Sequence, residues 1–424
     1  MNKNPSACGN SEELIPFARP AVGKDEEEAV LRVLRSGWIT TGAEALAFEG
    51  EFAAFLSESR EDGEGNGELP SPPPLRALAV NSATAGLHLA LEALGVGPGD
   101  VVLVPSYTFA ASAEVALYLG AEAAFVDVKR GSFSMDAEKL EEAVVRLREG
   151  KSAQPHGGAK GRARAIVAVH FAGLPCDIGS VARVAEKYGL SLVEDAAHSF
   201  PAWIDGGNGG RGAAGTAGDV GVFSFYATKT ITTGEGGMAV TRNEALAKRM
   251  SVMRLHGIDR PVWDRYSAGG GNWRYEIVAA GCKYNLCDIL AAIGRVQLRR
   301  ANELLAERKR IADVYDEAFG ADGRFILPPT APGDARHLYP LRLGTGTPPR
   351  DDVIDGMRGA GIGVSVHFIP LHTMPFYKKR YNLQEGDFPE TMKAFSAEVS
   401  LPLWPGMSDG QIEKVIKTTK NVCR

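Results

Sequence analysis

The 424-residue chain is poor in cysteine, has no excess of basic residues and contains no long apolar run. Its five cysteines, at positions 8, 176, 282, 287 and 423, have neither metal-site nor disulfide-framework spacing, which favours a reducing compartment. The 47 Lys and Arg against 52 Asp and Glu give a net charge of −5, so no basic field argues for nucleic acid.

Membrane and secretion signals are also missing. Residues 1–15 lack the apolar segment of a signal peptide, and the small-residue stretch 109–126 is interrupted by Glu114 and Glu122. We therefore expect a cytoplasmic protein with no membrane partner.

The chain is longer than one hydrophobic core usually allows, so two domains are expected. Between residues 77 and 241 short apolar strands alternate with helical stretches, which predicts a mostly parallel seven-stranded sheet covered by helices on both faces, an α/β fold. The expected strands are 77–80, 101–104, 124–128, 165–169, 190–194, 220–225 and 237–241.

We expect a large domain over residues 1–285, including an N-terminal arm, and a smaller α+β domain over 286–424. The small domain should begin with helix over 286–319 and contain strands at 338–343 and 364–368. Residues 57–75 are acidic and then proline-rich, 150–163 basic and glycine-rich, and 205–217 glycine-rich, so we expect loops there and a flexible insert at 57–75.

Lys229 follows the expected strand at 220–225, in the run GDVGVFSFYATKTITTGEGG (218–237). A lysine at the carboxyl edge of a buried strand is partly desolvated, so its pKa falls and its amine becomes nucleophilic. Alone, such a lysine is more often a solvated surface charge.

Asp195 ends the neighbouring expected strand and leaves the sheet at the same edge, where ligands of open α/β sheets bind. Taken alone, it reads better as a helix N-cap. Pyridoxal phosphate requires a lysine for the Schiff base and a carboxylate on its pyridine nitrogen, so the two residues together favour this cofactor.

A phosphate site is expected where a helix begins after Asn81 and Ser82. The first turn offers backbone N–H groups at Ala83, Thr84 and Ala85 and the Thr84 hydroxyl, to which Ser224 can add another. Phe109 follows the strand at 101–104, where an aromatic ring can lie against a planar cofactor or simply pack in the core.

These motifs resemble the DegT/DnrJ/StrS family of nucleotide-sugar aminotransferases, which are pyridoxal-phosphate enzymes of fold type I. The resemblance runs nearly end to end, through SGWITTG (36–42), NSATAGLHLAL, PSYTFAAS, VHFAGLPCDI (169–178), EDAAHSFPA, FSFYATKTITTGEGG, RLHGIDR (254–260), KYNLCDILAAIGRVQL (283–298) and GIGVSVHFIPLH (361–372). Within the family, LHGI, CKYNLCDI and SVHFIPLH look most like the UDP-4-amino-4-deoxy-L-arabinose synthase branch, which aminates C4 of UDP-linked 4-keto sugars.

The resemblance implies a role for each of several residues. Lys229 would form the Schiff base, Asp195 would bind the pyridine nitrogen, His198 would lie beside the ring oxygen and Phe109 would stack on the ring. Thr84, Ala85 and Ser224 would hold the phosphate, joined by Asn285 from the other subunit of a homodimer with shared active sites. The substrates would be glutamate and a keto sugar on a nucleotide, and the candidate sugar-side residues are Trp38, Thr40, His256, Tyr339 and His367.

Three other functions compete with this one. Dehydratases of the same fold carry histidine in place of the lysine, so Lys229 argues against them. Another fold-type-I enzyme, such as an amino-acid lyase or a desulfurase, remains open, although none of the cysteines is convincingly placed for a persulfide. A non-catalytic regulator would not need the lysine. We expect no metal site, because His367 and His372 are five residues apart with no carboxylate ligand nearby.

Overall fold

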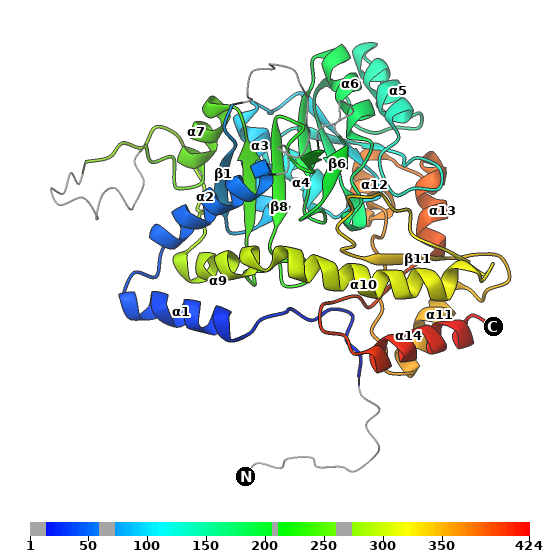
Figure 1. Cartoon of the computed structure of the whole chain (residues 1–424). Coiled ribbons are helices and arrows are strands. Elements are labelled where there is room, and N and C mark those ends of the chain that lie inside the picture. The colour runs from blue at the N-terminus through cyan, green and yellow to red at the C-terminus, as the bar shows by residue number, and fades with distance from the viewer. Residues whose placement is uncertain (1–13, 59–72, 206–210, 260–273) are drawn as a thin grey trace, which may run out of the picture.

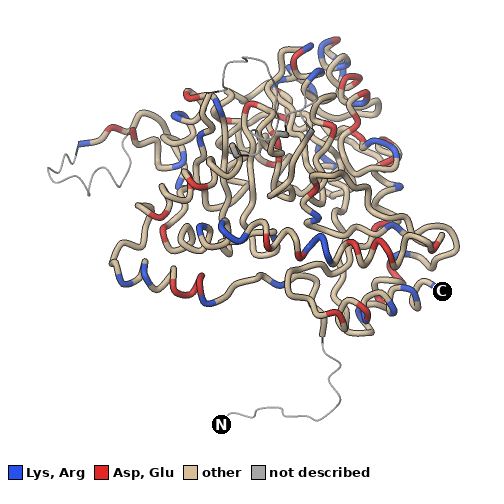
Figure 2. The backbone as a smooth tube through the Cα atoms, viewed as in Figure 1, with Lys and Arg blue, Asp and Glu red and all other residues tan. Residues whose placement is uncertain are grey.

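The computed structural model describes residues 14–58, 73–205, 211–259 and 274–424. Figure 1 shows a large unit built on a central sheet, with the long helix α10 and the smaller C-terminal unit below it. In the tube of Figure 2, positive and negative residues are interspersed over the described elements. Within the described residues, no helix has both the length and the apolar character needed to span a bilayer.

The central sheet has the seven strands expected from the sequence, in the order β1-β9-β8-β5-β4-β2-β3. All run parallel except β9, which is antiparallel to both of its neighbours. The strands are β1 (Arg76–Val80), β2 (Asp100–Pro105), β3 (Glu122–Val126), β4 (Arg162–Val169), β5 (Ser191–Asp195), β8 (Val220–Ser224) and β9 (Gly237–Thr241).

Helices cover both faces of this sheet because successive strand residues point to opposite sides. On one face Phe223 packs edge-on against Phe52 of α2, with ring centroids 5.1 Å apart, and on the other Val222 meets α3 at Gly86. The helices of the large unit are α1 (Lys24–Ser36), α2 (Ala43–Glu58), α3 (Ala83–Ala93), α4 (Ala111–Tyr118), α5 (Ala137–Arg148), α6 (Ile178–Tyr188), α7 (Glu244–Met253) and α9 (Asp288–Arg299).

The C-terminal unit has its own core around a three-stranded antiparallel sheet, β10-β11-β12. Its elements are α10 (Ala301–Gly320), β10 (Phe325–Ile326), β11 (Tyr339–Leu343), α11 (Arg350–Gly359), β12 (Glu398–Leu401) and α14 (Asp409–Val422).

The division at residue 285 stays a prediction, and segments cross it in both directions. Ile15 of the N-terminal arm is buried in the small core, where it pairs with Ile362. Conversely, α12 (Pro375–Tyr381) packs on the large core, with the ring of Tyr377 5.2 Å from that of Phe125, and α13 (Pro389–Ala397) follows it.

Two local predictions are wrong. The expected loop 205–217 contains β7 (Arg211–Ala213), which pairs with β6 (Trp203–Asp205). The expected strand 364–368 is reduced to one bridge between Ser365 and Ser400. The pairing with β12 ends there because His367 is the next residue that would bond to this strand. Its N–H donates to the Glu398 carboxylate at 3.0 Å instead of to a backbone carbonyl. The expected insert 57–75 lies largely outside the described residues.

Candidate active site

A cavity of about 580 Å³ opens at the carboxyl ends of the central strands. Its wall combines residues that follow β4, β5 and β8 with the start of α3, the N-terminal arm and two segments of the C-terminal unit. Among the lining residues are Phe17, Thr84, Phe109, Asp195, His198, Ser224, Lys229, His337, His367 and Phe368. Such a cavity is within the usual size range of small-molecule sites.

Lys229 lies in the turn after β8, where its N–H donates to the Tyr226 carbonyl at 2.9 Å. Burial lowers the pKa of its amine to about 7, and the nearby Arg308 guanidinium adds to this effect while Asp195 opposes it. The structure shows no hydrogen bond or ion pair to its Nζ from any described residue. The amine is thus neutral in a large fraction at physiological pH and available for bond formation.

Asp195 is buried at the end of β5, and donors on the protein side fix its orientation. Its Oδ2 accepts from the Ser112 hydroxyl at 2.7 Å and its Oδ1 from the Ala197 N–H at 3.2 Å. Ser112 is itself 2.8 Å from the Thr108 hydroxyl. Burial raises the pKa of Asp195, while these donors and the charge of Lys229 oppose the rise. A cationic ring nitrogen in the cavity would neutralise the charge of this buried carboxylate.

Glu194, which the sequence analysis did not single out, precedes Asp195 at the end of β5. Its fully buried carboxylate accepts from His170 Nε2 at 2.9 Å and from the N–H groups of Gly215, Ala217 and Gly218 at 2.7–3.0 Å. It therefore ties β4 and the turn before β8 to the end of β5.

The start of α3 offers donors for the expected anion site, whose phosphate role stays a prediction, with one difference from the expectation. The Ser82 hydroxyl accepts the Ala85 N–H at 3.1 Å, so that donor is already used for capping. The N–H groups of Ala83 and Thr84 remain, beside the hydroxyls of Thr84 and Ser224 at the cavity wall. A Cβ on Gly237 would lie 2.7 Å from Ala83 N, so only glycine lets β9 approach this turn.

Aromatic side chains line the rest of the wall. Phe109 is 59% exposed, and its ring centroid lies 5.8 Å from that of Phe368. His198 Nδ1 accepts the Ala172 N–H at 3.3 Å, which places its ring proton on Nε2. Burial, reinforced by Lys229, holds the pKa of His198 well below its usual range, so the imidazole is a neutral donor.

Of the proposed sugar-side residues, only His367 lines this cavity. Trp38 donates to Thr41, the Thr40 carbonyl accepts the Asp288 N–H, and the His256 N–H donates to Cys282, all away from the cavity wall.

Tyr339 does not reach the cavity either. Its side chain is fully buried in the small core, and its hydroxyl donates to Asp316 Oδ1 at 2.9 Å. We therefore remove Tyr339 from the candidate substrate residues.

Asn285 lies in a second hollow of about 450 Å³ between α2, β1 and α7, apart from Lys229 of the same chain. Its amide contacts Thr41 and Lys283. The predicted role of Asn285, a phosphate contact in the active site of another subunit, stays a prediction.

Besides Glu194 and Phe368, three further residues of the site escaped the sequence analysis. Phe17 belongs to the N-terminal arm, and His337 lies in a proline- and glycine-rich connection without helical or strand periodicity. His337 reaches the site because its N–H and that of Ala335 bind the carbonyls of Ala172 and Gly173.

The third is Arg308 of α10, which is buried. Its guanidinium donates to the carbonyls of His337 and Leu403, each at 3.0 Å, and of Thr228 at 3.4 Å. It thus connects the lysine turn to the C-terminal unit.

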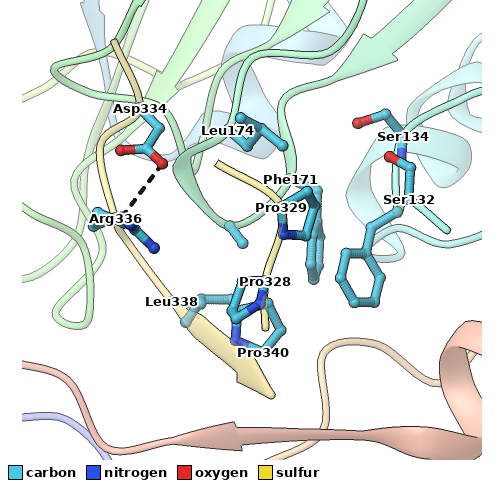
Figure 3. A pocket seen from close by; sticks show the side chains of 12 residues that line it. Ser132, Ser134, Phe171, Leu174, Pro328, Pro329, Asp334, Arg336, Leu338 and Pro340 are labelled. Atoms are coloured by element: carbon cyan, nitrogen blue, oxygen red, sulfur yellow. Dashed lines mark hydrogen bonds and ion pairs between the residues drawn. The ribbon is translucent and has the colours of Figure 1, made fainter. Parts of the chain in front are cut away.

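A smaller pocket of about 20 Å³ lies near β11, and Figure 3 shows its proline-rich wall. Its one cation, Arg336, is held by Asp334 at 3.4 Å and by Asp316 at 2.7 Å. With its charged groups already paired and so little room, this pocket does not compete with the large cavity. No group of His, Cys, Asp and Glu in the described part of the chain could hold a metal ion.

A buried lysine amine without a partner among the described residues, a buried aspartate and a helix start for a phosphate are together what a pyridoxal-phosphate site requires. Comparison with protein-family models matches residues 20–420 to the DegT/DnrJ/EryC1/StrS aminotransferase family. The chain belongs to this family.

Individual relatives agree. The chain is 36% identical over 416 residues to the spore coat polysaccharide biosynthesis protein SpsC of Bacillus subtilis, covering 97% of each. It is 37% identical over 417 residues to the uncharacterized protein MJ1066 of Methanocaldococcus jannaschii, covering 97% of this chain and 98% of that one. Among solved structures, the putative sugar aminotransferase Spr1654 from Streptococcus pneumoniae in its PLP form is 30% identical, with a TM-score of 0.81 over 97% of this chain and 98% of that one. Its PMP form matches with the same TM-score.

These findings confirm the predicted family, fold type I and enzyme class, and they confirm pyridoxal phosphate as the cofactor. The chain is a sugar aminotransferase of this family.

Proposed function

We propose that the chain transfers an amino group from glutamate to C4 of a UDP-linked 4-keto sugar, in a homodimer with shared active sites. The observation that carries the proposal is the neutral, unpaired Lys229 amine facing the oriented Asp195 carboxylate. The choice of UDP, of C4 and of glutamate rests on the resemblance of LHGI, CKYNLCDI and SVHFIPLH to one branch of the family.

The residues fit the cofactor. Ala83, Thr84 and Ser224 would hold its phosphate, Asp195 would bind its ring nitrogen, Phe109 would cover its ring and His198 would donate to its ring oxygen. Bound in this way, pyridoxal phosphate supplies an electron sink for the carbon that loses or gains a proton.

Lys229 then has two tasks. Its neutral amine would hold the cofactor, and the same amine would move the proton at Cα of glutamate and later at C4 of the sugar. Its lowered pKa suits both tasks at neutral pH. Phe17, Phe368 and His337 line the cavity, and burial holds the pKa of His337 well below its usual range, so these neutral rings would limit the access of water.

The direct test is incubation of the purified protein with glutamate and a panel of UDP- and dTDP-linked 4-keto and 3-keto sugars, followed by mass spectrometry and NMR of the products. We expect a 4-amino UDP sugar and no product from Lys229→Ala. Amination of dTDP sugars alone, or at C3, would overturn the finer assignment. No amino sugar from any member of the panel would overturn the proposed reaction.

The shared site can be tested with mixed dimers. If Asn285 serves the other subunit, Asn285→Ala paired with Lys229→Ala leaves one intact site and restores activity to about half of the wild-type dimer. The matched control pairs the double variant with wild type, which has no intact site. Activity in the control but not in the first mixture would place Asn285 in its own subunit's site.

A further inference from the structure

A hydrogen-bonded chain runs from the C-terminal unit to the cavity wall. His367 Nδ1 lies 2.9 Å from the Ser400 hydroxyl, and that hydroxyl lies 2.5 Å from Glu398 Oε1. The second carboxylate oxygen accepts the His367 N–H at 3.0 Å. Glu398 and Ser400 are alternate residues of β12, so both side chains point to the same face of the strand.

This hydrogen-bonded series of side chains is buried at its Glu398 end and reaches the cavity at its His367 end. Glu398 and Ser400 are fully buried, whereas His367 lines the cavity. Phe17 stacks on the imidazole, with ring centroids 5.3 Å apart and planes at 28°, which holds the ring in place. His367 Nε2 has no hydrogen-bond partner among the described residues, so it is the atom of this series that is available to a ligand in the cavity.

We propose that Glu398 and Ser400 are positioning residues that determine whether His367 Nε2 accepts or donates a hydrogen bond toward the sugar. That the ligand is a sugar rests on the proposed function, whereas the switch itself is a property of the protein alone.

The proton count allows two arrangements. With Glu398 ionised, the Ser400 O–H donates to the carboxylate, His367 Nδ1–H donates to Ser400, and Nε2 is a bare acceptor. With Glu398 protonated, its O–H donates to Ser400, the Ser400 O–H donates to Nδ1, and the ring proton lies on Nε2. One proton added at Nε2 thus ends on Glu398, and the imidazole is neutral before and after.

The groups around Glu398 and His367 place the change of the His367 tautomer near neutral pH. Burial raises the pKa of Glu398 to about 8, against the effects of Ser400, the His367 N–H and Arg350. Arg342, its register partner on β11, and the buried Tyr107 also face this carboxyl. Burial and Lys229 lower the pKa of His367 to about 4, and the other imidazoles near it, His198 and His337, have lowered pKa values too. The ring therefore changes tautomer without becoming charged.

The test is ¹⁵N NMR of the histidine-labelled holoenzyme, which distinguishes imidazole tautomers directly, with the signal assigned by loss in His367→Gln. We expect the His367 tautomer to change between pH 6 and 10 with a midpoint near 8. In Glu398→Gln and Ser400→Ala the tautomer should be independent of pH. The matched control is Glu413→Gln, at an exposed carboxylate of α14, which should leave the change intact. One tautomer throughout in wild type, or a change that persists in Glu398→Gln, overturns the proposal.

A kinetic arm separates this inference from the proposed function. The KM for the keto sugar should change about tenfold across the same pH range in wild type, the factor that corresponds to one hydrogen bond, and less than twofold in Glu398→Gln. The half-reaction with glutamate, followed by visible absorption, should not differ between the two. A tautomer change without turnover of any keto sugar would refute the function and keep the switch. Turnover with a pH-independent tautomer would refute the switch alone.

Discussion

The titration of Lys229 in the cofactor-free protein is the prediction that follows most directly from the site. With its pKa lowered to about 7, about three quarters of the amine is neutral at pH 7.5. An ordinary lysine is neutral in about one molecule per thousand at that pH, so Lys229 should react several hundredfold faster with amine reagents at equal intrinsic reactivity.

Competitive acetylation of the cofactor-free protein across pH 5–11, read by peptide mass spectrometry, measures this reactivity. The exposed Lys248 of α7 is an internal reference in the same sample. Asp195→Asn should move the Lys229 midpoint lower, because the carboxylate favours the charged amine, and Arg308→Met should move it higher. A Lys229 profile that follows that of Lys248 would refute the argument that burial activates this amine.

Four further outcomes are expected. Between pH 7 and 10 the free energy of unfolding of the cofactor-free protein should rise by about 3 kcal/mol more than that of Lys229→Met in denaturant titrations at each pH, because the unfolded state binds a proton that native Lys229 has released; the comparison with the variant removes the opposite contribution of Glu398. Arg308→Met should cost about 2–4 kcal/mol by chemical denaturation, since it leaves buried carbonyls unpaired, and recovery of full stability in Arg308→Lys would contradict the need for a forked donor. Thr84→Val should weaken cofactor retention about tenfold in equilibrium dialysis against pyridoxal phosphate, and unchanged retention would exclude its hydroxyl from the phosphate site. Tyr339→Phe should cost about 1 kcal/mol through the lost bond to Asp316 and leave the KM for the keto sugar unchanged, whereas a raised KM would restore it as a substrate residue.

The central sheet could be predicted because its strands are short apolar runs bounded by glycine and polar residues, and their ends place Lys229 and Asp195 at one edge. The failures have local causes. The apolar alternation at 364–368 suggested a strand, but the Glu398 side chain takes the N–H of His367 that the next rung would use. At 205–217, high glycine content hid a short strand that has a partner to pair with.

The site was predictable only where a motif ends a strand or begins a helix. Phe17 and His337 come from segments without periodicity, and only the packing of the two units brings them to Lys229. Ala85 is a different case, because the sequence correctly placed its N–H at the start of a helix. It could not predict that this N–H donates to the Ser82 hydroxyl and is therefore not available to a phosphate.

The pairing of the N-terminal arm with the C-terminal unit has a consequence for biosynthesis. Ile15 exchanges backbone hydrogen bonds with Gly361 and Gly363, at 2.9 and 2.8 Å, and Phe17 lies against His367. Ile15 and Phe17 therefore lack these partners until residues 361–367 have left the ribosome, about 20–70 s later at typical elongation rates. The complete cavity wall cannot form before residues 365–368 have been synthesised, so full enclosure of the cofactor must come late in the synthesis of the described residues.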